Sequence, residues 1–161
     1  MAHSLSRSIK SKSLSQTAKL AKDFLESIVP HSEHATIYGL SGNLGSGKTA
    51  FVKEVAHHLG LNKEDVTSPT FVIEKIYKIP NPRSTLYIHR FTHLIHIDAY
   101  RLEDPKELLS LGWKEISEDA HNLIMVEWPE IVREVLPANT RTIYFEFIDE
   151  TTRKIRMMNN E

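Results

Sequence analysis

The chain of 161 residues contains no cysteine. Disulfide bonds, thiolate metal sites and cysteine nucleophiles are therefore excluded, and the composition suits a reducing compartment. No apolar run approaches the roughly 18 residues that a membrane-spanning helix needs. The first residues are basic, but no apolar stretch follows them, as it would in a secretory signal. We therefore expect a cytoplasmic protein that does not bind a membrane.

Neither sign of charge dominates the chain. Lys and Arg number 20 and Asp and Glu number 21, which gives a net charge of 20 − 21 = −1. This balance provides no overall attraction to nucleic acid. Hydrophobic residues make up 40% and charged residues 25%, which is typical of one domain with a proper core. We expect residues 1–13 to form a flexible leader and residues 14–161 to form a single domain.

Segments with strand-like and helix-like patterns alternate along the chain. The helices are expected at residues 15–28, 48–59 and 129–135, and the strands at residues 35–40, 70–77, 86–97, 123–126, 142–148 and 152–158. The run LIMV at 123–126 is typical of a buried parallel strand, and a turn at 149–152 joins the last two strands into a hairpin. The pattern predicts an α/β domain whose sheet is largely parallel, flanked by helices and antiparallel at one edge.

Glycine is scarce, yet three of the six glycines fall in the octapeptide GNLGSGKT. This segment fits the pattern G-x-x-x-x-G-K-[ST] of a phosphate-binding loop and lies between an expected strand and an expected helix. The candidate nucleotide-binding residues are Gly42, Asn43, Leu44, Gly45, Ser46, Gly47, Lys48 and Thr49. Lys48 would reach the β- and γ-phosphates, while the Thr49 hydroxyl would bind Mg²⁺. The sequence thus predicts a fold of the P-loop NTPase type.

Two acidic residues follow expected strands and are candidates to complete a metal site. Glu127 comes directly after LIMV, and Asp98 comes after LIHI. In open α/β sheets ligands bind at the carboxyl ends of the strands, so both acids are expected near the phosphate loop. One of them would coordinate the metal, and the other would position the attacking water. The alternative is that either acid only caps a strand end at the surface.

Four motifs in this order give the chain a resemblance to a known family. GNLGSGKT, TSPTFVIEKIY, HIDAYRL and LIMVEWPE resemble the motifs of the TsaE family, also called YjeE. The resemblance spans about residues 14–155. It implies a P-loop ATPase that uses ATP and Mg²⁺, that works with the TsaD and TsaB proteins in N6-threonylcarbamoyladenosine synthesis, and that meets tRNA indirectly through that complex.

The resemblance also implies roles for individual residues. Thr49 and Glu127 would be the metal ligands, and Lys48, Asp98 and Thr70 would be catalytic. Thr70 would lie in a switch-like loop near the γ-phosphate. Further nucleotide contacts are implied for three residues outside the loop: Thr17, Glu130 and Arg153.

Two other classes of function stay open at this point. P-loops also serve small-molecule kinases, although no clear arginine cluster for an acceptor lid is present. A nucleotide-binding module without hydrolysis is the other alternative. The histidines His89, His93 and His96 could suggest a metal site by spacing, but in a strand the first two face one side and the third the other. We interpret them as ordinary polar positions, and residues 78–95 as an extended hairpin or loop.

Overall fold

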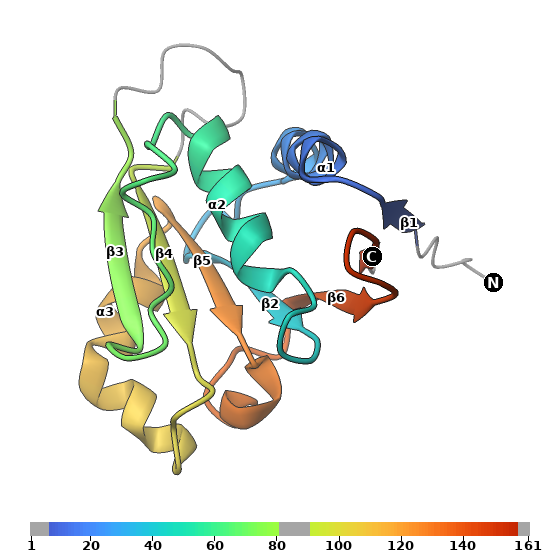
Figure 1. The fold of residues 1–161 in the computed structure, drawn as a ribbon. Helices are drawn as coiled ribbons and strands as arrows, with labels where there is room; N and C mark the ends of the chain where they lie inside the picture. The colour runs from blue at the N-terminus through green and yellow to red at the C-terminus, as the bar shows by residue number, and fades with distance from the viewer. Residues whose placement is uncertain (1–6, 81–90, 158–161) are drawn as a thin grey trace, which may run out of the picture.

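The computed structural model describes residues 7–80 and 91–157, and within these ranges the chain folds around one mixed sheet of seven strands (Figure 1). The order across the sheet is β1-β7-β6-β2-β5-β4-β3. The strands are β1 (Arg7–Ser11), β2 (Thr36–Ser41), β3 (Glu74–Lys78), β4 (His93–Asp98), β5 (Asn122–Glu127), β6 (Arg141–Phe147) and β7 (Arg153–Met157). The four central strands, β6, β2, β5 and β4, run parallel to one another. This arrangement confirms the expected α/β class.

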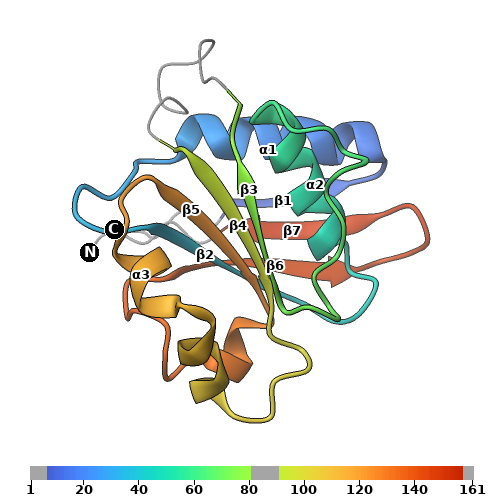
Figure 2. The same cartoon turned by 90° about the vertical axis from the view of Figure 1, so that its left-hand side faces the viewer.

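Helices cover both faces of the sheet (Figure 2). One face packs against α1 (Leu14–Ser27) and α2 (Lys48–His58), with Phe24 and Phe51 fully buried between them. The other face packs against the 3₁₀ helices η2 (Pro105–Leu111) and η3 (Pro129–Val132) and the short helix α3 (Trp113–Glu118). No helix in these described ranges is long and apolar enough to cross a membrane.

The register of the parallel strands places the ends of three strands side by side. Asp98, the last residue of β4, lies opposite Glu127, the last residue of β5. Glu127 lies in turn opposite Leu40 of β2, one residue before that strand ends and the glycine-rich loop begins. Because the carboxyl ends of parallel strands meet at one edge, two acids separated by 29 residues (127 − 98) meet the loop that follows β2.

Several boundaries differ from the sequence-based expectations. Residues 7–11, assigned to a flexible leader, instead form β1, which pairs antiparallel with β7. Antiparallel pairing consequently occurs at both edges of the sheet, since β3 also pairs antiparallel with β4. The expected helix at 129–135 is only a 3₁₀ helix over Pro129–Val132. The hairpin at the end of the chain is confirmed, whereas most of the expected segment 78–95 lies outside the described residues.

The start of α1 also differs from the expectation, by one residue, since the helix begins at Leu14. Ser13 is the N-cap, and its hydroxyl accepts a 3.2 Å hydrogen bond from the backbone N–H of Gln16. A serine cap of this kind stabilises a helix by about 1 kcal/mol. The cap fixes the entry of α1 directly after β1, so the N-terminal strand and the first helix are positioned together.

Candidate functional site

The glycine-rich loop joins β2 to α2, and its last glycine precedes the first residue of the helix. Gly47 is the N-cap of α2 with φ of 100°, a left-handed conformation that glycine adopts without steric cost. The backbone N–H groups of the first turn of α2 have no partner within the helix and face the loop. The positive end of the helix dipole lies there as well. The segment is therefore built to bind an anion.

Lys48 is held by the loop itself. Its Nζ donates hydrogen bonds to the carbonyl oxygens of Gly42 and Asn43, the latter at 3.0 Å. Nζ also lies 4.3 Å from the centroid of the Trp128 ring. Burial lowers the pKa of Lys48, while the negative charges of Glu127, Asp98 and Glu130 oppose this effect. Among the described residues, the hydrogen-bond acceptors that Nζ reaches are these two carbonyl oxygens.

Glu127 is a buried carboxylate with two hydrogen-bond donors on the same oxygen. Its Oε1 accepts from the Thr49 hydroxyl at 2.7 Å and from Nε2 of His96 at 3.1 Å. Burial by itself would raise the pKa of Glu127. The hydrogen bonds from His96 and Thr49 and the charge of Lys48 outweigh burial and hold the pKa below its ordinary value. The carboxylate is therefore ionised at neutral pH.

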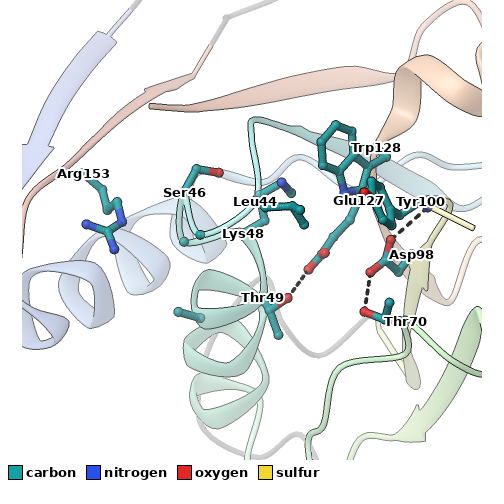
Figure 3. A pocket seen from close by; sticks show the side chains of 13 residues that line it. Leu44, Ser46, Lys48, Thr49, Thr70, Asp98, Tyr100, Glu127, Trp128 and Arg153 are labelled. Atoms are coloured by element: carbon teal, nitrogen blue, oxygen red, sulfur yellow. Dashed lines mark hydrogen bonds between the residues drawn. The ribbon is translucent and has the colours of Figure 1, made fainter. Parts of the chain in front are cut away.

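Asp98 lies at the end of β4 and contacts the loop that precedes β3. Its Oδ2 accepts a 2.8 Å hydrogen bond from the Thr70 hydroxyl, and its Oδ1 accepts from the backbone N–H of Tyr100 at 3.0 Å. These bonds are drawn in Figure 3, where the carboxylates of Asp98 and Glu127 face the same space. The two acids are thus fixed by different partners at one edge of the sheet.

A cavity of about 400 Å³ lies between the loop, Thr70 and the two acids. Most of the expected catalytic and nucleotide-binding residues line it. They are Leu44, Gly45, Ser46, Gly47, Lys48, Thr49, Thr70, Asp98, Glu127 and Arg153, together with Ala50, Tyr100 and Trp128. The hydroxyl of Ser46 is buried and, within residues 7–80 and 91–157, has no hydrogen-bond partner. An unsatisfied donor in a loop of free amides fits a phosphate.

A second cavity, of about 310 Å³, adjoins the first on the side of α1. Both are lined by Ser46, Gly47, Ala50 and Arg153. Thr17, one of the expected nucleotide contacts, lines the second cavity, and its hydroxyl lies 2.7 Å from that of Ser11. The two cavities together extend from the acids past Arg153 to α1.

The structure places Glu130 apart from the other expected residues. Glu130 lines neither of these two cavities but a third, where it lies beside Arg133 and Tyr144. Its Oε1 accepts a hydrogen bond from the Ser41 hydroxyl. Gly42 and Asn43 do not line the two cavities either, and they face Lys48 through their carbonyl groups.

Two non-glycine residues beside the site have a left-handed backbone. Trp128, directly after Glu127, has φ of 58°, and Ile73, in the loop after Thr70, has φ of 70°. The conformation costs roughly 1–2 kcal/mol for a residue with a side chain. Strain of this kind gathers at functional sites, where surrounding contacts impose it.

The donor set suits Mg²⁺ rather than a metal held by protein ligands alone. In the two described ranges, no group of three or more His, Asp and Glu side chains could hold a metal ion. Mg²⁺ prefers hard oxygen ligands, binds one or two side chains and completes its shell with phosphates and water. The Thr49 hydroxyl donates its one proton to Glu127, so its lone pairs are free for a cation. Thr49 and Glu127 therefore fit the ion.

The sequence interpretation missed two residues of this site. His96, assigned to an ordinary polar position, is fully buried and bonded to Glu127. Tyr100 lines the cavity and lies 5.1 Å from Trp128, measured between ring centroids. A possible signal for both was their position two residues before and two residues after Asp98. His89 lies outside the described residues.

Comparisons with known proteins find relatives over most of the chain. Residues 11–155 match the family model described as threonylcarbamoyl adenosine biosynthesis protein TsaE. The chain is 34% identical to the tRNA threonylcarbamoyladenosine biosynthesis protein TsaE of Rickettsia felis over 90% of this chain and 75% of that protein. It is 37% identical to the TsaE protein of Borreliella burgdorferi over 63% of this chain and 65% of that one.

A solved structure gives the same fold. The crystal structure of YdiB from Bacillus subtilis superposes with a TM-score of 0.65, covering 98% of this chain and 87% of that chain, at 24% sequence identity.

Proposed function

The chain belongs to the TsaE family of tRNA threonylcarbamoyladenosine biosynthesis proteins, and we propose that within it this protein is a magnesium-dependent ATPase. The observation that carries the proposal is the convergence of Lys48, Thr49, Glu127 and Asp98 on one cavity. Each supplies a group that phosphoryl transfer from ATP to water requires.

In this proposal the phosphates of ATP occupy the cavity of about 400 Å³. Lys48 exchanges the carbonyl groups of Gly42 and Asn43 for phosphate oxygens, which gives its charge a better partner. The free amides at the start of α2 and the Ser46 hydroxyl bind the same oxygens. Positioning and charge stabilisation of this kind supply most of the catalysis in phosphoryl transfer.

Thr49 and Glu127 are the residues that would hold Mg²⁺. A bound Mg²⁺ would supply positive charge that neutralises the negative charge developing on the phosphates during transfer. The lowered pKa of Glu127 keeps its carboxylate ionised and ready to bind a cation at neutral pH.

Asp98 and Thr70 would arrange the attacking water. Asp98 is fixed by the backbone of Tyr100 through one oxygen, and its other oxygen accepts from Thr70. A carboxylate held at the cavity can accept a hydrogen bond from water and orient it toward the γ-phosphate. The nucleoside would lie in the adjoining cavity, between Thr17 and Arg153.

The partners in the proposal are the TsaD and TsaB proteins, which would carry out the threonylcarbamoyl transfer to tRNA in the cytoplasm. The chain itself would contact tRNA only through that complex. Support comes from the family membership and from the net charge of −1, which gives the chain no general attraction to RNA.

Steady-state ATP hydrolysis tests the proposal. We expect slow turnover by the purified protein, which requires MgCl₂ and increases when TsaB and TsaD are added. Lys48→Ala should abolish it, because no other side chain replaces the charge inside the loop. Lys53→Ala, on the same helix but outside both cavity linings, is the matched control and should keep the wild-type rate.

Two results would contradict the proposal. Hydrolysis by Lys48→Ala at the wild-type rate would remove the loop from the mechanism. Hydrolysis by the wild type that is indifferent to TsaB and TsaD would contradict the partner-gated ATPase and favour a metabolite kinase.

A further inference from the structure

His96 is a fully buried histidine next to the magnesium site that we propose. It lies on β4, two residues before Asp98, and has 0% exposure. Alternate residues of a strand share a face, so His96 and Asp98 point to the same side of the sheet as Leu94. Leu94 belongs to the core beneath α1 and α2. The imidazole is therefore inserted between the core and the loop that begins α2.

The contact of His96 is with a carboxylate on the neighbouring strand. In the register of β4 and β5, His96 lies opposite Met125, and Glu127 is two residues further along. Nε2 of His96 reaches diagonally to Oε1 of Glu127 at 3.1 Å. A carboxylate only accepts hydrogen bonds, so Nε2 carries the proton.

This bond determines which oxygen of Glu127 is left for a cation. Thr49 and His96 both donate to Oε1, from two different elements. Within residues 7–80 and 91–157, no side chain or backbone group donates to Oε2. A glutamate side chain has three rotatable bonds, and two donors on one oxygen fix its orientation with the other oxygen free.

Packing alone does not account for a histidine at this position. The Nδ1 atom of His96 is buried and has no hydrogen-bond partner in the part of the chain that the structure describes. An unsatisfied buried polar atom destabilises the fold, and a leucine would fill a similar volume without that cost. The compensating gain is the bond to Glu127.

We propose that His96 is a positioning residue that orients Glu127, so that its free oxygen and the Thr49 hydroxyl together face Mg²⁺. The inference rests on the proposed function, because it assigns Glu127 to the metal. Outer hydrogen-bond partners of metal ligands commonly change metal affinity by about 10–100-fold when they are removed. His96 does not line the cavity that we assign to the phosphates, so its effect should appear in the metal dependence alone.

The experiment measures ATP binding by isothermal titration calorimetry, once in EDTA and once at saturating MgCl₂. The ratio of the two Kd values gives the tightening that Mg²⁺ provides. The variants are His96→Leu, which removes the donor, His96→Gln, whose amide N–H reaches the place of Nε2, and His96→Asn, whose amide falls short of it. His93→Gln on the same strand is the matched control, because His93 faces the opposite side.

We expect His96→Leu to lower the tightening ratio about tenfold or more, with a Kd in EDTA within about twofold of the wild type. His96→Gln should retain most of the ratio, His96→Asn should resemble His96→Leu, and His93→Gln should match the wild type. If His96 acted only in folding, its replacement would change the Kd in EDTA and the Kd in MgCl₂ by the same factor. Thermal melting by circular dichroism identifies the folded variants.

Four results would overturn the inference. A folded His96→Leu protein with the wild-type ratio would show that Glu127 needs no partner on β4. Equal loss in His96→Gln and His96→Leu would show that the donor is not the relevant property. If His96→Leu does not fold, the test is the comparison of His96→Gln with His96→Asn. Equal tightening ratios in these two variants would contradict the positioning role of His96. If the wild-type protein itself has a tightening ratio of one, Mg²⁺ does not strengthen ATP binding. That result would contradict the magnesium site itself, and with it the role of His96.

Discussion

The Thr70 hydroxyl donates a 2.8 Å hydrogen bond to Oδ2 of Asp98, which joins the loop before β3 to the end of β4. A backbone bond reinforces the connection, since the N–H of Asp98 donates to the carbonyl of Ile73 at 2.8 Å. Thr70 lines the cavity beside the glycine-rich loop. A change at Thr70 on nucleotide binding would therefore reach Asp98 through direct bonds.

We expect Asp98 to act in the hydrolysis of ATP and not in its binding. We predict that Asp98→Asn keeps ATP affinity within about threefold but lowers the hydrolysis rate about 100-fold or more, because a neutral amide is a poor acceptor for the proton of water. ATP binding by calorimetry and phosphate release by a coupled assay measure the two effects. Asp65→Asn, at an exposed turn, is the control. Loss of ATP binding in Asp98→Asn would place Asp98 in the binding shell instead.

The contact of Lys48 with Trp128 predicts an optical signal. Nζ of Lys48 lies 4.3 Å from the indole centroid, and a bound triphosphate would draw it away. We therefore expect ATP with MgCl₂ to change the tryptophan emission. The chain has two tryptophans, so Trp113→Phe should keep the change and Trp128→Phe should lose it. An unchanged signal in Trp128→Phe would show that Lys48 does not report on the nucleotide through this ring.

Removing the charge of Glu74 should stabilise the protein, by an amount that depends on pH. Burial raises the pKa of the Glu74 carboxyl, and its Oε2 has no hydrogen-bond partner among the described residues. The folded protein therefore disfavours the charged form. The destabilisation is fully present above the raised folded pKa and is absent below the ordinary value of 4.5. Glu74→Gln should raise the melting temperature by about 2 °C at pH 7 and by less as the pH falls toward 4.

Glu64→Gln is the matched control for this measurement, because Glu64 is exposed. It should leave the melting temperature unchanged at both pH values. A Glu74→Gln protein that melts below the wild type at pH 7 would show that the Glu74 charge stabilises the fold, contrary to the direction given by its burial.

Two glycines of the loop should tolerate alanine differently. A Cβ at Gly42 would meet the carbonyl oxygen of Phe145 and lie 2.6 Å from the Ser46 hydroxyl, whereas a Cβ at Gly45 would meet nothing within 4 Å. Gly45→Ala should cost about 1 kcal/mol of unfolding free energy for its left-handed backbone. Gly42→Ala should cost about 3 kcal/mol, since a backbone group must move. Urea unfolding measures both, and equal costs would contradict the close packing.

The local patterns of the sequence were sufficient to predict the centre of the fold. The glycine-rich loop has a fixed spacing that depends on neighbouring residues alone, and LIMV is apolar on both faces because helices cover both faces of β5. Glu127 followed from these two elements, since a parallel strand beside β2 must end near the loop. The roles of these residues in hydrolysis stay predictions.

The parts that the sequence did not predict depend on distant partners. RSIKS has one apolar residue, Ile9, and becomes a strand only because β7 offers a partner at the end of the chain. TFVIEKIY resembles a full strand, but the left-handed Ile73 delays β3 until Glu74. The position of His96 in the strand gives its side of the sheet but not the carboxylate on the neighbouring strand.

The pairing of β1 with β7 has a consequence for synthesis of the protein. Arg7 lies opposite Met157, a separation of 157 − 7 = 150 residues, and Arg153 and Thr17 line one cavity. During synthesis on the ribosome, β1 cannot pair with β7 until nearly the whole described chain has been translated. A chain interrupted before Arg153 would carry the glycine-rich loop without the hairpin that completes its second cavity. Such a fragment could not form both cavities, so assembly of the nucleotide site that we propose depends on translation reaching β7.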